Sequence, residues 1–163
     1  MVFRPGVNYA DMTDQSIDII LSPVVTAQWD VFWQELPAQL RSYAPADTLV
    51  ISTVFAAGSA EEQQMQKMLG ACKLDPSQYR VVQMDAGQQM AWHRLRDLLQ
   101  PTKILLLGIT PAQLGISALF VAHEVNNFDK VQWMPTAGLT QLLQDNNLKQ
   151  HLWTNVFRKV YFG

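Results

Sequence analysis

The last third of the chain shows the same arrangement twice: a short apolar run, a turn that contains proline, and a helix-forming segment. In the first unit the apolar run 104–107 leads into the turn 108–111. In the second the run 131–134 leads through 135–136 into a helical pattern over 137–144. Short apolar strands that alternate with helices predict a mainly parallel sheet. In open sheets of this kind ligands bind at the carboxyl ends of the strands, so the pattern also indicates where a site should lie.

Earlier segments extend this alternation. Residues 48–55 are mostly apolar and β-branched, which is typical of a strand covered on both faces, and residues 79–84 form another such run. Helical patterns cover 60–71, 88–99, 137–144 and about 148–161. We therefore predict an α/β fold, a three-layer α/β/α sandwich with a central, mainly parallel four-stranded sheet.

Residues 1–47 differ from the rest of the chain. They hold two cations, Arg4 and Arg41, against the acids Asp11, Asp14, Asp18, Asp30, Glu35 and Asp47. Within them the apolar spacing over 26–40 predicts one amphipathic helix, which Pro37 ends or kinks. We expect residues 1–47 to be an N-terminal extension packed on an α/β domain at 48–163, the whole forming one globular domain. The charge pattern fits an acidic segment on a near-neutral body, or a weakly cationic face on the body that includes Arg158 and Lys159.

Composition excludes several classes of function. The formal net charge of −2 gives no basic excess, so we expect weak or no DNA binding. Cys72 is the one cysteine, which rules out an internal disulfide and cysteine-held zinc or iron–sulfur groups. His93, His123 and His151 fall in separate elements, so we expect neither a metal nor another cofactor.

Two further features bear on location. No apolar run reaches the roughly 20 residues that a membrane-spanning helix needs. The first residues lack a basic stretch that leads into an apolar one, so we expect no signal peptide and a cytoplasmic protein. The sequence does not indicate an oligomeric state.

Two segments carry a family resemblance. Residues 94–114 read as a helix ending in Leu and Pro, an apolar strand, a Gly and a helix start, and residues 134–153 read as Pro-Thr, a Leu-rich helix, a break, and Lys and Trp on the last helix. Their order and spacing resemble the uracil-DNA glycosylase superfamily from about Thr48 to the C-terminus. The resemblance implies the α/β/α fold of that superfamily.

The chain departs from this superfamily at the residues that carry its chemistry. Met134 stands where active members have a His, and a Met side chain cannot donate the hydrogen bond that stabilises the leaving uracil. Residues 55–59 contain no carboxylate or amide to position water, and the iron–sulfur branches need several cysteines. The resemblance therefore implies a member without glycosylase activity.

A catalytically silent relative also fits. The break at 74–81 is similar to that of the psi subunit of the bacterial replicative polymerase's clamp-loader assembly. The C-terminal part shares with it the positions Pro135, Leu139, Thr140, Leu142, Leu152 and Trp153. This similarity implies a protein partner, such as the replication machinery, and an assembly role.

Strand-to-helix junctions supply the candidate pocket. Thr136 is either only a helix cap or the residue whose neighbouring free amides hold an anion. Thr110 precedes a proline at the first helical position, and Asp85 follows a strand as a turn residue or a pocket residue. Ser59 has Glu62 at capping-box spacing. The candidate pocket residues are Ser59, Asp85, Thr110, Met134, Pro135 and Thr136.

Trp29 and Trp33 lie one helical turn apart outside the core of the resemblance. They either pack their helix onto the sheet or anchor a protein partner.

We expect a non-catalytic interaction or assembly subunit, in DNA replication or repair. One alternative is an unorthodox enzyme or a nucleotide- or phosphate-binding protein, with Ser59, Asp85, Thr110 and Thr136 lining its site. A further alternative is a DNA-binding remnant without excision activity.

Overall fold

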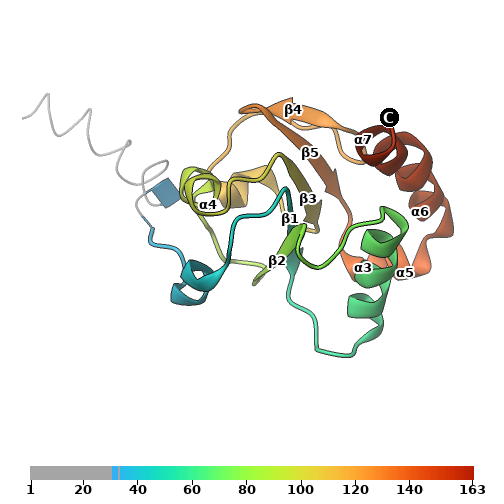
Figure 1. The fold of residues 1–163 in the computed structure, drawn as a ribbon, viewed down its shortest axis with the longest axis horizontal. Helices are drawn as coiled ribbons and strands as arrows, with labels where there is room; N and C mark the ends of the chain where they lie inside the picture. Colours follow the sequence, from blue (N-terminus) through green and yellow to red (C-terminus); the bar gives the residue numbers. More distant parts are fainter. Residues whose placement is uncertain (1–30, 33) are drawn as a thin grey trace, which may run out of the picture.

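The sheet has five strands in the order β2-β1-β3-β5-β4 (Figure 1). The computed structural model describes residues 31–32 and 34–163, so the predictions for Trp29 and Trp33 lie outside the described residues. The strands are β1 (Thr48–Thr53), β2 (Tyr79–Met84), β3 (Lys103–Leu107), β4 (Asn126–Phe128) and β5 (Val131–Thr136). All are parallel except β4, which pairs antiparallel with β5. The predicted α/β class is confirmed, whereas the prediction of four strands is wrong.

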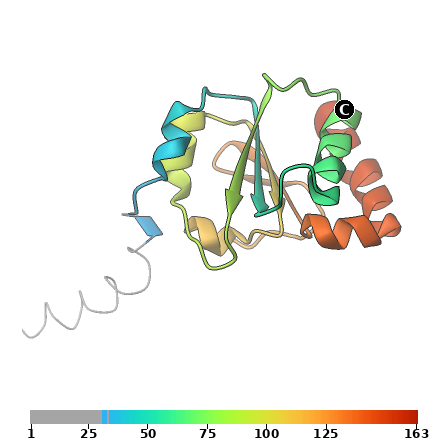
Figure 2. The same ribbon diagram turned by 90° about the horizontal axis from the view of Figure 1, so that it is seen from below.

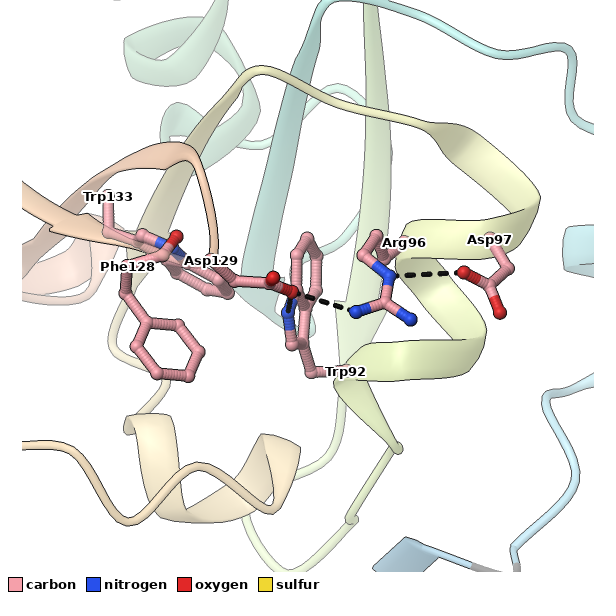
Figure 3. A network of polar contacts seen from close by, with 6 residues as sticks. All are labelled: Trp92, Arg96, Asp97, Phe128, Asp129 and Trp133. Carbon is pink, nitrogen blue, oxygen red and sulfur yellow. Dashed lines mark hydrogen bonds and ion pairs between the residues drawn. The ribbon is translucent and has the colours of Figure 1, made fainter.

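The missed strand β4 belongs to a tight hairpin. Asp129 and Lys130, between β4 and β5, both have positive φ values, 50° and 61°, as in a type I′ turn. The Asp129 carboxylate accepts a hydrogen bond from the Trp92 indole at 2.8 Å and one from Arg96 at 2.9 Å (Figure 3). These two hydrogen bonds, from Trp92 first and then from Arg96, lower the pKa of Asp129. They join the hairpin turn to α4 (Trp92–Leu99).

Helices cover both faces of the sheet (Figure 2). One face carries α3 (Ala60–Ala71), α5 (Leu139–Gln144), α6 (Asn146–Leu152) and α7 (Arg158–Tyr161), and the other carries α4 and the 3-10 helix η1 (Ala38–Ser42). Successive strand residues point to opposite faces of the sheet. Leu105 therefore belongs to the core on the α3 face, while Ile104 and Leu106 belong to the core on the α4 face.

Aromatic side chains fill the core on the α4 face. Trp133 is fully buried, and its ring centroid lies 4.7 Å from that of Trp92 and 5.4 Å from that of Phe120. Its indole nitrogen donates to the Phe128 carbonyl at 3.0 Å, which satisfies the polar atom that burial removes from water.

The α3 face is built from a helix that the sequence predicts correctly. Ser59 caps α3 by accepting from the Glu62 amide at 3.3 Å, and Met65, Met68 and Cys72 are buried on one side. Burial raises the pKa of the Cys72 thiol to about 11, so the thiol is protonated at neutral pH.

Three predicted helices differ from the observed ones. Residues 34–37 are not helical, and Pro37 precedes η1, because its ring fixes an extended approach rather than continuing a helix. The helix expected from 88 begins at Trp92, since the Met90 amide donates to the Gln113 carbonyl and the Gln113 side chain donates to Gln88. The last helix passes through a π-helical turn, η3 (Trp153–Phe157), before α7.

None of the helices in the described part of the chain combines the length and apolar character of a membrane span.

Candidate functional site

The carboxyl ends of β1, β3 and β5 meet at one edge of the sheet, where this fold class binds ligands. Two connections touch there. Gly108 has a φ of 73°, and a Cβ placed on it would lie 3.0 Å from the Gly138 Cα atom and 3.3 Å from Thr53 Cγ2. The chain after β3 and the chain after β5 are therefore in backbone contact, with no room for a side chain between them.

The three junction residues at the end of β5 are part of the core. Met134 is 1% exposed and packs among the apolar residues of the α3 face, and Pro135 is also buried. The interpretation of Thr136 as a helix cap is wrong, because Gly138 is the residue that precedes α5. Thr136 instead ends β5 with its hydroxyl 2.9 Å from His123 Nδ1.

Two histidines that the sequence places in separate elements meet beside Thr136. His123 has a φ of 62°, and its amide donates to the Pro135 carbonyl at 2.7 Å. His151, on α6, has its Nε2 atom 3.1 Å from the His123 carbonyl oxygen and 3.4 Å from a Glu124 carboxylate oxygen. His123 and His151 are 28 positions apart in the chain, so no local sequence pattern predicts their contact. Across residues 31–32 and 34–163, no group of three or more metal-ligating side chains is found.

The other predicted pocket residues have structural roles. Ser59 caps α3, and the Thr110 amide donates to the Gln113 side chain at 3.0 Å at the start of η2 (Pro111–Leu114). Asp85 is an exposed turn residue whose carbonyl accepts from the Gln88 amide. The structure thus places these three residues at two caps and a turn.

Sequence reasoning missed one amide at the candidate site. Residues 55–59 lack a carboxylate or amide of their own, but Gln83 on the neighbouring strand β2 reaches this loop. Its Oε1 atom accepts from the Phe55 amide at 3.1 Å. The parallel pairing of β1 with β2 makes this approach possible, because both strands end at the same edge.

Two cavities lie elsewhere. One of about 420 Å³ is lined mainly by apolar residues of α4, η2 and β4, among them Trp92, Leu114, Ile116 and Phe128. A smaller one of about 210 Å³ lies between η1 and β2. Neither is lined by any of the six candidate pocket residues. Their walls come from segments far apart in the chain, so the sequence gives no pattern from which to find them.

No protein-family model matches this chain, and no curated protein matches it. The geometry of the residues is therefore the basis for a functional interpretation.

The opposite, amino end of the sheet has a different surface. Tyr161, at the end of α7, has its hydroxyl 3.1 Å from that of Thr48, the first residue of β1. Burial raises the pKa of Tyr161 to about 12, so the phenol stays neutral. Phe162 follows Tyr161 directly, and its ring centroid lies 5.9 Å from that of Trp153 on the preceding helical turns. These two residues are 46% and 37% exposed, respectively.

Proposed function

We propose that this protein is a non-catalytic subunit with a fold of the uracil-DNA glycosylase type, and that it acts by binding other proteins in DNA replication or repair. One observation carries the proposal. The predicted pocket residues at the carboxyl end of the sheet are core, cap and turn residues, whereas the exposed aromatic residues Trp153 and Phe162 lie together on the C-terminal helices, which reach the amino end at Tyr161.

Two described positions at the carboxyl end differ from the groups that uracil excision uses in the resembled superfamily. The thioether of Met134 is buried in the core and has no hydrogen to donate to a leaving uracil. Gln83 supplies an amide near the first strand, but its oxygen is bonded to the Phe55 amide. Both features support a role that does not depend on base excision.

Affinity purification from the native host tests the proposal. The tagged protein should recover replicative polymerase or clamp-loader subunits, identified by mass spectrometry against an unrelated tagged protein of similar size. Thr136→Val, which removes the hydroxyl that faces His123, should recover the same subunits in the same amounts. Recovery of no such subunit by either protein would contradict the assembly role.

A second candidate function, an unorthodox hydrolytic enzyme, has one observation in its favour. A hydroxyl hydrogen-bonded to an imidazole, as in Thr136 and His123, is the geometry of a nucleophile and its general base. Against it, Thr136 is only 8% exposed.

An assay for uracil excision from DNA tests the non-catalytic role against enzymatic base excision. With the protein in large excess over uracil-containing single- and double-stranded DNA, we expect no abasic sites above a mock preparation after long incubation. Product that disappears with His123→Ala would favour the enzyme.

A further inference from the structure

A π-helical turn aligns aromatic and cationic residues on one side of the last helix. The Arg158 amide donates to the Trp153 carbonyl, five residues earlier, and the Phe162 amide donates to the Arg158 carbonyl at 3.0 Å. Trp153, Arg158 and Phe162 therefore follow one another on successive turns. An unbroken α-helix would instead align Trp153 with Phe157, which is buried. Such π turns occur often at functional sites.

One cation contacts one of these two exposed rings, and two more lie on the same helix. Lys73, just after α3, places its ammonium nitrogen 5.7 Å from the centre of the Phe162 ring, a cation–π distance. The exposed side chain of Lys159 lies one turn before Phe162. Figure 2 shows α3 and the C-terminal helices on the same face of the sheet, where they share one core. We call these residues the amino-end patch: Lys73, Trp153, Arg158, Lys159 and Phe162.

Among the residues that the structure describes, Lys73, Arg158 and Lys159 form no ion pair with a carboxylate. Some of the other cations are paired, such as Arg96 with Asp129 at 2.9 Å, whereas Lys67, Lys130 and Lys149 also form no ion pair with a described carboxylate. Unpaired positive charge beside exposed aromatic rings is complementary to a ligand that carries both carboxylates and an apolar side chain.

From this geometry we infer that the amino-end patch binds an acidic segment of a partner protein that carries an aromatic or large apolar residue. The inference rests on the proposed assembly role and names the surface and the chemistry of the partner. The carboxylates pair with Lys73, Arg158 and Lys159, and the apolar side chain packs against Trp153.

The patch fits a peptide better than a nucleic acid. Single-stranded nucleic acids stack their bases on open aromatic faces. Here the Trp153 and Phe162 rings meet edge to face at 62°, and Lys73 lies over the Phe162 ring.

A nuclear magnetic resonance titration of the whole protein tests this inference. The probe is a short synthetic peptide of aspartate and phenylalanine, and the reporter is the indole N–H signal of Trp153, assigned with Trp153→Phe. We expect this signal and the Phe162 amide to shift on titration, and the binding to weaken as salt is added. A peptide of the same length with lysine in place of aspartate should cause no shift.

Charge variants give the quantitative test. Lys73→Gln, Arg158→Gln and Lys159→Gln together should weaken peptide binding about tenfold, the combined effect of three exposed pairs. Lys130→Gln, which removes a cation from the β4–β5 turn, should leave the affinity unchanged.

Three results would overturn the inference: no shift at Trp153, equal shifts with the lysine peptide, or stronger patch shifts with oligothymidylate than with the acidic peptide. If the titration fails while the host purification recovers replication subunits, the assembly role stands and this surface assignment falls.

Discussion

The two ends of the sheet contrast in how they use their residues. At the carboxyl end Gly108 and Gly138 are in contact, Met134 is buried, and Thr136 bonds to a histidine. At the amino end Trp153 and Phe162 remain exposed. In open α/β sheets the carboxyl end is the usual ligand site. Here the junctions after β3 and β5 are packed against each other, while Val54, directly after β1, is 59% exposed.

This contrast shows that a fold class indicates the place of a ligand site only by analogy with other proteins of that class. Function depends on which side chains reach solvent and which charges lack partners. By that measure the amino-end patch stands out because it combines exposed aromatic rings with cations that pair with no described carboxylate, while the predicted pocket residues at the carboxyl end hold strands and helices together.

The largest expected difference in the free energy of unfolding is between alanine substitutions at two tryptophans, one buried and one exposed. Trp133→Ala should lower the free energy of unfolding by about 3–5 kcal/mol, because it empties a fully buried site packed by Trp92 and Phe120. Trp153→Ala should cost less than about 1 kcal/mol, since that ring belongs to a partly exposed surface pair. Urea denaturation of both variants measures this. Equal losses would show that the amino-end patch is part of the folding core.

Two glycines test the packing of the carboxyl end. Gly108 and Gly58 have similar φ values, 73° and 75°, but only Gly108 has backbone within contact distance of an added Cβ. We expect Gly58→Ala to cost about 1 kcal/mol for the left-handed conformation, and Gly108→Ala about 2–4 kcal/mol because the steric clash adds to it. Thermal and urea unfolding compare the pair. If the two variants lost the same stability, a Cβ at position 108 would fit beside Gly138 without a steric clash, contrary to the observed contact.

The hairpin turn gives the smallest effect, and it depends on pH. Hydrogen bonds from Trp92 and Arg96 lower the pKa of Asp129, so the carboxylate stabilises the fold above its unfolded pKa of about 3.9. This contribution is lost as pH falls through the lower folded pKa. Asp129→Asn should therefore be less stable than wild type near neutral pH, with the difference shrinking below about pH 3.5.

The control for this pH effect is Asp97→Asn, which removes a carboxylate from the same guanidinium but keeps the Trp92–Asp129 bond (Figure 3). The measurement is the urea-denaturation midpoint of the wild type and of both variants, near neutral pH and below about pH 3.5. A difference that stayed constant from neutral to acid pH would mean that the ionisation of Asp129 plays no part.

Local patterns in the sequence predict the parallel strands and the α3 cap. Apolar runs define β1, β2, β3 and β5, and the spacing of Ser59 and Glu62 gives the cap. The strand β4 is missed because it has only three residues, two of them asparagine, and its turn is Asp-Lys rather than a turn with glycine.

What the sequence does not predict depends on contacts between distant segments. Gln113 holds residues near Gln88 out of the helix, and His123 reaches Thr136 across a loop. The π-helical turn shifts the alignment of Trp153 from Phe157 to Arg158, so a helical pattern drawn at 3.6 residues per turn misses the amino-end patch.

One comparison of recovered partners tests the central claim that this protein works by protein binding and that the amino end carries it. The tagged wild type, the Thr136→Val variant and the triple variant of Lys73, Arg158 and Lys159 are each purified from the native host and their partners quantified by mass spectrometry. Wild type and Thr136→Val should recover the same replication subunits, and the triple variant should lose most of them while remaining folded. Equal recovery by the triple variant would contradict the account, and so would loss of the subunits in Thr136→Val.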